Sequence, residues 1–352
     1  MEEKDDIKFM RRCIELASKA EGLTYPNPLV GSVLTLGGKI IGEGYHLKSG
    51  QPHAEVNAIN SVRDKSELGG ATLYVNLEPC SHFGKTPPCA DFIIASSIKK
   101  VVIGTCDTST KVSGKGIDKL RSSGCEVTVG VLEEECRNLN RRFFTYHERQ
   151  RPYITLKWAQ SADGYLDIKR TDFHAVRPTW ISGNPERVLV HKWRASEQAI
   201  LVGGGTVRAD NPGLNVREWT GNDPVKVILS STANFGNAAL FKPGGTVILF
   251  TRNMQTDVDA TLVKLAEDKP AAVQIADYLY KTGIQSLFVE GGATVLNHFI
   301  ANNMWDEARI FSGNSDFKDG VRSPDLNGMK VSKAAFRGSS LEIYTNDNRP
   351  IQ

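Results

Sequence analysis

The chain has 352 residues, 40% hydrophobic and 24% charged, a composition typical of a globular protein and not of a disordered, collagen-like or membrane protein. Its 43 basic residues nearly balance 40 acidic residues, and the net charge of +3 disfavours a nucleic-acid-binding or polybasic membrane-binding protein. The charged N-terminus is followed by no apolar stretch of the signal-peptide type, so we expect a cytoplasmic protein.

The distribution of cysteines indicates two different modules. At roughly 100 to 200 residues per domain, the length suggests two domains. All six cysteines lie between Cys13 and Cys136, and none follows. In a cytosolic chain, clustered cysteines are more typical of metal ligands or small core residues than of disulfides. A charged run at 147–152 ends in Pro152, so we expect domains at 1–147 and 148–352.

Apolar segments of strand length alternate with amphipathic segments of helix length along the whole chain, and this predicts an α/β protein. In the first half we expect helices at 6–20, 53–63 and 133–144, a hairpin of 29–36 with 39–45, and strands at 71–76, 100–105 and 125–131. In the second half we expect strands at 153–158, 225–229 and 246–250, with a long loop at 165–177.

A set of metal-ligand side chains follows in the first half. His53-Ala54-Glu55 begins a predicted helix, Cys80 follows a predicted strand, and Cys89 comes nine residues later. One imidazole and two thiolates suit tetrahedral Zn²⁺ with the fourth position left for water, the arrangement of catalytic zinc sites. Zinc lowers the pKa of that water to about 7, which gives a hydroxide nucleophile. Glu55 is then the residue that carries a proton to the leaving nitrogen, as in zinc deaminases.

Other interpretations of these residues remain open. Each of them alone is more often a buried core residue than a ligand. A non-enzymatic zinc module is a further alternative, although a purely structural zinc site is expected to have four protein ligands and only three are visible. The remaining cysteines lack ligand spacing, and we expect them in the core: Cys13, Cys106, Cys125 and Cys136.

Four sequence segments resemble the bifunctional deaminase/reductase family of riboflavin biosynthesis. They are TYPNPLVG at 24–31, GEGYH at 42–46, PHAE at 52–55 and LEPCSHFGKTPPC at 77–89. The eight-residue gap between the cysteines separates this family from cytidine and tRNA-adenosine deaminases. The resemblance implies a cytidine-deaminase-like domain and a diaminopyrimidinone ribosylamino 5′-phosphate as substrate. Asn27 and His46 help to hold that substrate.

The second half resembles the reductase half of the same family. The similar segments are KWAQSADG at 157–164, TWIS at 179–182, 199–212 and 288–294. Two of them are glycine-rich turns after apolar strands, where a helix N-terminus can face a pyrophosphate. Neither turn is the G-x-G-x-x-G of a dinucleotide-binding domain. The resemblance implies a dihydrofolate-reductase-like fold that uses NADPH, with hydride transfer to C1′ that opens the ribosylamino sugar to a ribityl group.

The resemblance also implies roles for individual residues of the second half. Lys157 lies beside the reacting ribose and, with Glu290, forms the catalytic pair. The implied substrate contacts are Arg194, Leu214, Arg217 and Glu290. The implied cofactor contacts are Ala159, Trp180, Thr206, Asp210, Ser231, Gly291, Gly292, Ala293 and Thr294. From its position after a predicted strand, Arg252 is our candidate cation for the 2′-phosphate of NADPH.

Five positions depart from the usual family pattern: Ser109, Thr110, Pro178, Gln198 and Ser230. They leave open a second interpretation, an active deaminase with a degenerate reductase half. A third is a nucleic-acid-editing zinc deaminase with an accessory domain, which the near-neutral charge disfavours. We therefore expect zinc and NADPH as cofactors, a phosphorylated pyrimidine as partner, and neither nucleic acid nor membrane. The sequence leaves the oligomeric state open and allows a homo-oligomer.

Overall fold

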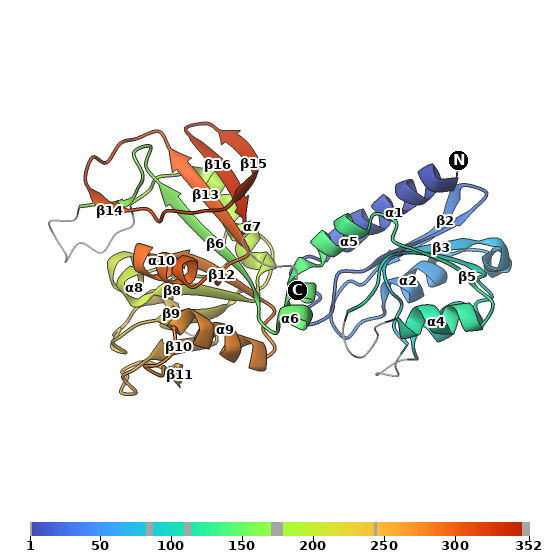
Figure 1. Ribbon diagram of the computed structural model, residues 1–352, viewed down its shortest axis with the longest axis horizontal. Coiled ribbons are helices and arrows are strands. Elements are labelled where there is room, and N and C mark those ends of the chain that lie inside the picture. The colour runs from blue at the N-terminus through green and yellow to red at the C-terminus, as the bar shows by residue number, and fades with distance from the viewer. Residues whose placement is uncertain (1, 82–86, 109–113, 170–178, 243–244, 347–352) are drawn as a thin grey trace. The chain divides into compact units, whose positions relative to one another are not determined.

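The computed structural model describes residues 2–81, 87–108, 114–169, 179–242 and 245–346. The chain forms two compact units, Met1–Gln150 and Arg151–Gln352, which divide a few residues after position 147, where the sequence indicates a boundary. Each unit is a β-sheet with helices on its faces (Figure 1). In the described part of the chain, no helix is long and apolar enough to cross a membrane.

The first unit is built on a five-stranded sheet in the order β2-β1-β3-β4-β5. β1 pairs antiparallel with both β2 and β3, whereas β3, β4 and β5 run parallel. The strands are β1 (Gly31–Leu36), β2 (Lys39–Tyr45), β3 (Thr72–Leu77), β4 (Lys100–Thr105) and β5 (Glu126–Val129). The helices are α1 (Glu2–Ser18), α2 (Ala54–Ser61), α3 (Cys89–Ala95), α4 (Lys115–Ser122), α5 (Glu133–Leu139) and α6 (Arg141–Arg149), with a 3-10 turn at Lys65–Gly70.

Both faces of this sheet are covered because successive strand residues point to opposite sides. Val33 packs with Phe9 and Met10 of α1 on one face. Its neighbour Leu34 packs on the other face, in a cluster that also holds residues of α2, α3 and α4 such as Ile93. The central strands β1, β3 and β4 are therefore buried on both faces.

The helix expected at 133–144 is two helices, and this part of the prediction is wrong. α5 ends at Leu139 and α6 begins at Arg141. Between them, the side chain of the buried Asn140 forms two hydrogen bonds with the backbone of Leu29. Its Oδ1 accepts the N–H of Leu29 at 2.8 Å, and its Nδ2 donates to the carbonyl of Leu29 at 2.9 Å. This tertiary contact fixes Asn140 outside helical geometry and joins α5 and α6 to the segment before β1.

We expect Asn140→Ala to destabilise the first unit by about 1–3 kcal/mol, since the N–H of Leu29 would lose its buried acceptor and the Leu29 carbonyl would keep only the Asn76 amide, at 3.0 Å. Circular dichroism in a urea titration would measure the change. All five tryptophans follow residue 150, so tryptophan fluorescence reports the second unit and serves as the control. Asn140→Asp keeps an acceptor but loses the donor, and we expect an intermediate effect. An unchanged transition in Asn140→Ala would contradict this account.

The second unit is built on a nine-stranded sheet in the order β11-β10-β9-β8-β12-β6-β13-β16-β15. The strands from β11 to β13 are parallel, and β16 and β15 complete the sheet as antiparallel strands. The strands are β6 (Tyr153–Gln160), β8 (Ala199–Gly203), β9 (Val225–Leu229), β10 (Val247–Thr251), β11 (Thr261–Lys264), β12 (Ser286–Gly291), β13 (Glu307–Gly313), β15 (Met329–Phe336) and β16 (Ser339–Thr345). The helices are α7 (Asn184–Ser196), α8 (Gly204–Asp210), α9 (Ala271–Lys281) and α10 (Ala293–Ala301), with a 3-10 turn at Ala239–Phe241.

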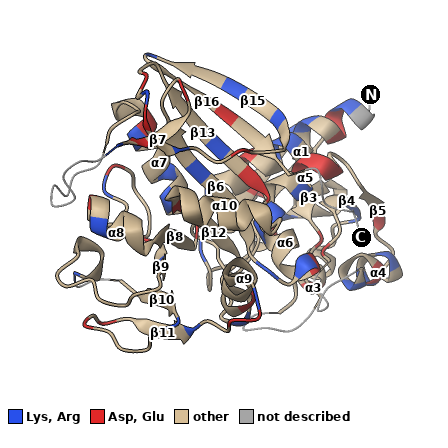
Figure 2. Ribbon diagram, turned by 60° about the vertical axis from the view of Figure 1, so that its left-hand side comes forward, with Lys and Arg blue, Asp and Glu red and all other residues tan. Residues whose placement is uncertain are grey.

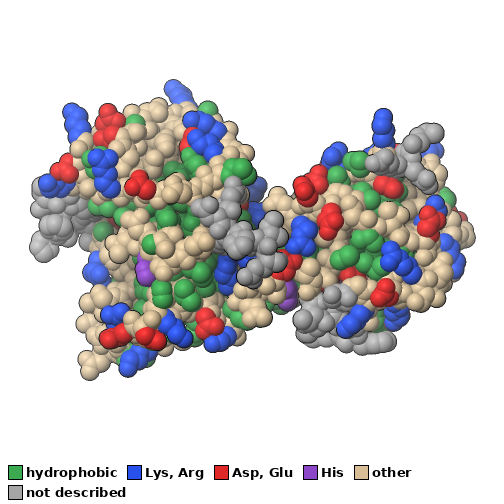
Figure 3. Space-filling model, viewed as in Figure 1, with side chains coloured by type: hydrophobic (Ala, Val, Ile, Leu, Met, Phe, Trp, Pro, Cys, Tyr) green, Lys and Arg blue, Asp and Glu red, His purple; other side chains and the backbone are tan. Residues whose placement is uncertain are grey.

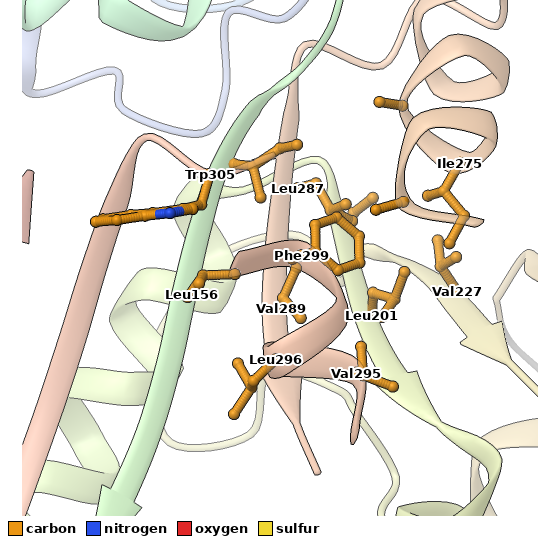
Figure 4. Packing of buried hydrophobic residues seen from close by; sticks show 14 of the residues in the cluster. Leu156, Leu201, Val227, Ile275, Leu287, Val289, Val295, Leu296, Phe299 and Trp305 are labelled. Carbon is orange, nitrogen blue, oxygen red and sulfur yellow. The ribbon is translucent and has the colours of Figure 1, made fainter. Parts of the chain in front are cut away.

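The parallel strands of this unit are buried on both faces, as their continuous apolar runs require. Figure 4 shows one face, where Leu201 and Val289 of the sheet pack with Leu296 and Phe299 of α10. On the other face Val202 and Phe288 pack in a second cluster with α7. Parallel strands end at a common edge, so the residues that follow β6, β8, β9 and β12 lie along one side of the sheet.

The segment expected to be a loop at 165–177 begins with a strand, which corrects the prediction. β7 (Tyr165–Ile168) pairs antiparallel with β14 (Gly320–Arg322) as a separate two-stranded sheet. Residues 170–178, which include Pro178, lie outside the described residues. The remaining strands agree with prediction to within a few residues, and those at 100–105 and 225–229 match in full.

The cysteines and surface charges also agree with expectation. All six cysteines are free; Cys13, Cys125 and Cys136 are buried, and Cys106 is half-buried. Lysines, arginines and acidic residues alternate along the described ribbon without a continuous stripe of one sign (Figure 2). On the face shown in Figure 3, side chains of both signs are interspersed on each unit.

Candidate active sites

Three metal-ligand side chains meet at one end of the first sheet. Cys80 follows β3, Cys89 is the first residue of α3, and His53 is the N-cap of α2. Their ligand atoms lie within 4.8 Å of one another, and in the described part of the chain this is the one such group of three or more. His53 Nδ1 lies 3.6 Å from Cys80 Sγ and 3.3 Å from Cys89 Sγ. The structure thus brings together three residues that the sequence spreads over 37 positions from 53 to 89.

Without a metal, the two cysteines share a proton: hydrogen bonding with Cys80 raises the pKa of Cys89 and also raises that of His53, whereas Cys80 shifts in the opposite direction. The Cys89 backbone N–H donates to Cys80 Sγ at 3.3 Å. Hydrogen bonding from Cys89 and His53 outweighs burial and lowers the pKa of Cys80 to about 4, so Cys80 is a thiolate. Thiolates and neutral imidazole are the usual ligands of zinc, and three of them leave one coordination position open. The donor set therefore fits a catalytic zinc ion.

Glu55 lies beside this cluster but is not one of its three ligands. It occupies the first turn of α2 and is 3% exposed. Its Oε2 atom has no hydrogen-bond partner among the described residues. Burial, with a smaller contribution from Cys80, raises the pKa of Glu55 to about 7. A buried carboxyl group of this kind can hold or release a proton close to the metal-binding atoms.

Asn27 and His46 form a hydrogen-bonded chain next to the cluster. His46 Nδ1 lies 3.1 Å from the Pro52 carbonyl, so Nδ1 must donate. His46 Nε2 is then the acceptor and receives the Asn27 amide Nδ2 at 3.1 Å. Burial lowers the pKa of His46, which agrees with a neutral ring. Its ring centroid lies 5.3 Å from that of His53, so the two residues expected to hold substrate adjoin the metal ligands.

Sequence reasoning missed Glu78, which organises the loop beside the site. This buried carboxylate accepts backbone N–H groups from Asp107 at 3.2 Å, Gly114 at 3.0 Å, Gly116 at 2.9 Å and Ile117 at 3.3 Å. Its signal in the sequence is an acidic residue directly after an apolar strand. The carboxylate fixes the ends of the segment that contains Ser109 and Thr110, which lie outside the described residues.

The second unit holds a buried charged group at the carboxyl ends of β6 and β12. Arg194 of α7 forms a bidentate ion pair with Glu290 of β12, in which the Nε–Oε1 and Nη2–Oε2 distances are both 2.7 Å. Their side chains are 11% and 9% exposed. Lys157 lies on β6, the strand next to β12, one residue beyond the paired Leu156. The three residues expected around the reacting sugar are therefore neighbours in the fold.

The electrostatics of this group keep Glu290 ionised and Lys157 easier to deprotonate than usual. Burial opposes ionisation of Glu290, but the charges of Arg194 and Lys157 and the hydrogen bonds of Arg194 lower its pKa to about 2. Burial lowers the pKa of Lys157, with the Glu290 charge opposing that shift. Within the described residues, Lys157 Nζ has no hydrogen bond or ion pair. Its ammonium group is available to a ligand.

A second residue that sequence reasoning missed is His191, one turn before Arg194 on α7. The backbone N–H of Arg217 donates to His191 Nδ1 at 3.2 Å, so Nδ1 is unprotonated. Burial and the charges of Arg194 and Arg217 lower the pKa of His191 to about 4. His191 thus ties the segment with Arg217 and the buried Leu214 to α7. Its spacing of three residues from Arg194, on the same helix face, was the available signal.

The expected cofactor residues lie along the edge formed by the carboxyl ends of the strands. Gly292 is the N-cap of α10, and its N–H donates to Thr206 Oγ1 of α8 at 3.0 Å. Ile181, next to the exposed Trp180, lies against Gly313 at the end of β13. Also at this edge are Ala159 of β6, Ser231 after β9, Arg252 after β10, Gly291 of β12, and Ala293 and Thr294 of α10, whereas Asp210 is the last residue of α8, a helix that begins at this edge.

Two of the five positions that depart from the family pattern, Gln198 and Ser230, lie among the described residues. Gln198 lies at the opposite end of the sheet, where its Oε1 accepts the N–H of Gln285 at 2.6 Å. It supports the entry into β8 and is remote from the edge that holds the site. Ser230 is buried at the carboxyl end of β9, on the site edge.

The two units match known protein families. Residues 3–105 match the cytidine and deoxycytidylate deaminase zinc-binding region, and residues 152–314 match the RibD C-terminal domain. The expected fold class, an α/β chain with a deaminase-like unit followed by a reductase unit, is confirmed.

The chain is also similar to individual proteins over nearly its full length. The riboflavin biosynthesis protein RibD of Aquifex aeolicus is 41% identical over 366 aligned positions, which cover 96% of this chain and 98% of that protein. The crystal structure of a diaminohydroxyphosphoribosylaminopyrimidine deaminase/5-amino-6-(5-phosphoribosylamino)uracil reductase from Thermotoga maritima is 38% identical, with a TM-score of 0.89 over 98% of this chain and 100% of that chain. RibD of Acinetobacter baumannii is 31% identical, with a TM-score of 0.87 over 97% and 99%. With both domain types present in this order, the chain belongs to the family of bifunctional deaminase/reductases of riboflavin biosynthesis.

Proposed function

We propose that residues 1–147 deaminate the diaminopyrimidinone ribosylamino 5′-phosphate and that residues 148–352 reduce the ribosyl group of the product with NADPH. The observation that carries this proposal is the presence of two separate, complete side-chain groups, one in each unit: His53, Cys80 and Cys89 with Glu55, and Lys157 with the Arg194–Glu290 pair. A degenerate reductase half would be expected to lose the second group.

In the deaminase half, this chain's residues hold the metal, orient the substrate and move a proton. When bound by His53, Cys80 and Cys89, zinc supplies a water of pKa about 7 as the nucleophile. Glu55 accepts a proton beside the metal ligands and delivers it to the leaving amino group, which departs as ammonia. Asn27, whose amide is oriented by the neutral His46, holds the pyrimidine.

In the reductase half, the protein contributes charged side chains that bind and position the substrate and the cofactor. NADPH supplies the hydride for C1′ of the ribosylamino group. Lys157 donates to the ribose as the ring opens, while Glu290 holds Arg194 in place and its charge opposes the loss of the Lys157 proton. Arg217 pairs with the substrate phosphate, because a half-exposed guanidinium suits bidentate contact with phosphate oxygens. The buried Leu214 lies in the segment that His191 ties to α7, and the helix N-terminus at Gly291–Thr294 faces the cofactor pyrophosphate.

The direct experiment is to incubate the purified chain with the phosphorylated aminopyrimidine, first alone and then with NADPH. We expect ammonia and the deaminated product without NADPH, and the ribitylamino product once NADPH is added. Formation of the first product alone would support a deaminase with a degenerate reductase. Formation of neither would contradict the proposal.

Loss of a metal ligand provides an independent test of the zinc group. We expect the unmodified chain to hold about one zinc per molecule and Cys89→Ser to release it, since two remaining ligands bind zinc weakly. Metal analysis after dialysis measures the content. Cys106→Ser is the matched control, because Cys106 is a half-buried cysteine outside the group. Full zinc content in Cys89→Ser would refute the ligand assignment.

A further inference from the structure

In the second unit, the order of the strands indicates in which direction an extended cofactor would run along the carboxyl ends of the strands. Under the proposed function, on which this inference rests, the nicotinamide lies near Lys157 on β6 and the pyrophosphate at the N-terminus of α10, after β12. The next strands along the sheet are β8, β9 and β10. An extended dinucleotide that continues in the same direction places its adenosine ribose at the carboxyl end of β9.

Three hydroxyl residues stand at that end of β9. We call Ser230, Ser231 and Thr232 the hydroxyl cluster; Ser230 is buried, and the other two are exposed. The Thr232 backbone N–H donates to Ser230 Oγ at 3.3 Å, which gives the turn a fixed shape. The cluster contains no carboxylate that would repel an anion.

A guanidinium is already fixed beside this cluster. Arg208 of α8 donates from Nη1 to Thr232 Oγ1 at 3.1 Å. Its guanidinium carbon also lies 5.6 Å from the centroid of the Phe235 ring. The backbone N–H of Phe235 is in turn held by Asp257 at 2.9 Å, so the loop that supports Arg208 is itself anchored. Arg208 nevertheless stays exposed to a ligand.

The contact between α8 and the hydroxyl cluster depends on Gly204. A side chain at Gly204 would collide with Ser230 Oγ and would lie 3.4 Å from Arg208 Nη1. With hydrogen at this position, the first turn of α8 approaches the end of β9 closely. The same helix carries Thr206, which accepts the N–H of Gly292 at the start of α10. One short element thus connects the expected pyrophosphate site to the hydroxyl cluster.

Arg252 differs from Arg208 in how it is held. It follows β10, one strand beyond β9, and is exposed. No hydrogen bond or ion pair holds it within the described residues. A mobile side chain loses more conformational entropy on binding than one already fixed. We therefore expect Arg252 to contribute less than Arg208 to the binding of a phosphate.

We propose that Arg208, supported by the hydroxyl cluster, binds the ribose 2′-phosphate and so determines the preference for NADPH over NADH. A guanidinium fork pairs bidentately with phosphate oxygens, and the exposed hydroxyls of Ser231 and Thr232 add donors from the other side. NADH lacks this phosphate and gains nothing from the group.

Binding measurements on the full chain test the assignment without turnover. Isothermal titration calorimetry would compare adenosine 2′,5′-bisphosphate with AMP, and NADPH with NADH. For Arg208→Gln we expect roughly 10- to 100-fold weaker binding of the two ligands that carry the 2′-phosphate, as for loss of a charge-assisted hydrogen bond. Binding of AMP and NADH should be nearly unchanged, and Arg208→Lys should fall between.

Two further variants make the result specific. Arg337→Gln removes the same charge from the exposed turn between β15 and β16, at the other end of the sheet, and should leave all four affinities unchanged. Arg252→Gln should cause a smaller loss than Arg208→Gln. Equal weakening of NADPH and NADH by Arg208→Gln, no weakening, or a larger loss in Arg252→Gln would each overturn the inference. An unmodified chain that binds NADPH no better than AMP would instead contradict the proposed reductase function and this inference with it.

Discussion

Glu55→Gln should keep its zinc and lose the deamination rate by about 10²- to 10⁴-fold, the usual contribution of a positioned general acid–base group. Glutamine has nearly the shape of glutamate, and Glu55 lies outside the set of three ligand atoms within 4.8 Å. The metal site should therefore be undisturbed while the proton carrier is lost. Ammonia release and metal content, measured on the same preparation, test both statements.

The matched comparison for Glu55→Gln is Cys89→Ser, which should lose both zinc and activity. The two variants together separate holding the metal from moving the proton. Unchanged ammonia release in Glu55→Gln would transfer the proton role to another group. Loss of zinc in Glu55→Gln would mean that Glu55 is needed to hold the metal.

The grouping of His53, Cys80 and Cys89 could be predicted from the sequence because each residue lies in a short segment with a recognisable pattern. His53 and Glu55 are separated by one residue at a helix start, and both cysteines flank one loop. Glu78 was missed for the opposite reason. Its partners are backbone N–H groups 29 to 39 residues away, and backbone groups leave no trace in residue identity.

The errors in the predicted helices and strands have a similar origin. Periodicity alone predicts one helix at 133–144, but Asn140 interrupts it because its amide binds the backbone of Leu29, 111 residues earlier. β7 was missed because it is short and its partner β14 comes about 150 residues later. Local patterns predict elements well, whereas tertiary contacts decide where elements end.

The Arg194–Glu290 ion pair shows how far the reductase site could be predicted from the sequence. Resemblance indicated Arg194 and Glu290 as substrate contacts and grouped Glu290 with Lys157 as the catalytic pair. In the structure, Glu290 forms its ion pair with Arg194, 96 positions away. This leaves Lys157 Nζ without an ion pair among the described residues, which is the more useful state for a group that acts on the substrate.

Lys157→Met should lower hydride transfer by roughly 10²- to 10³-fold, as for loss of one positioned donor, and leave ammonia release intact. The Lys157 side chain makes no hydrogen bond or ion pair within the described residues, so its replacement leaves no protein donor or acceptor unpaired. Glu290→Gln is a less direct test, because it leaves the Arg194 charge buried without its partner, a change that costs about 3–5 kcal/mol. NADPH oxidation with already deaminated substrate measures the effect.

The reciprocal measurement completes the test of two separate sites. Glu55 belongs to the first unit and Lys157 to the second, and each has its own group of partners. Glu55→Gln supplied with deaminated substrate should therefore oxidise NADPH at close to the unmodified rate, while Lys157→Met should still release ammonia from the aminopyrimidine. If Glu55→Gln abolished reduction with its circular dichroism unchanged, the two chemistries would share residues, and the assignment of one reaction to each unit would be wrong.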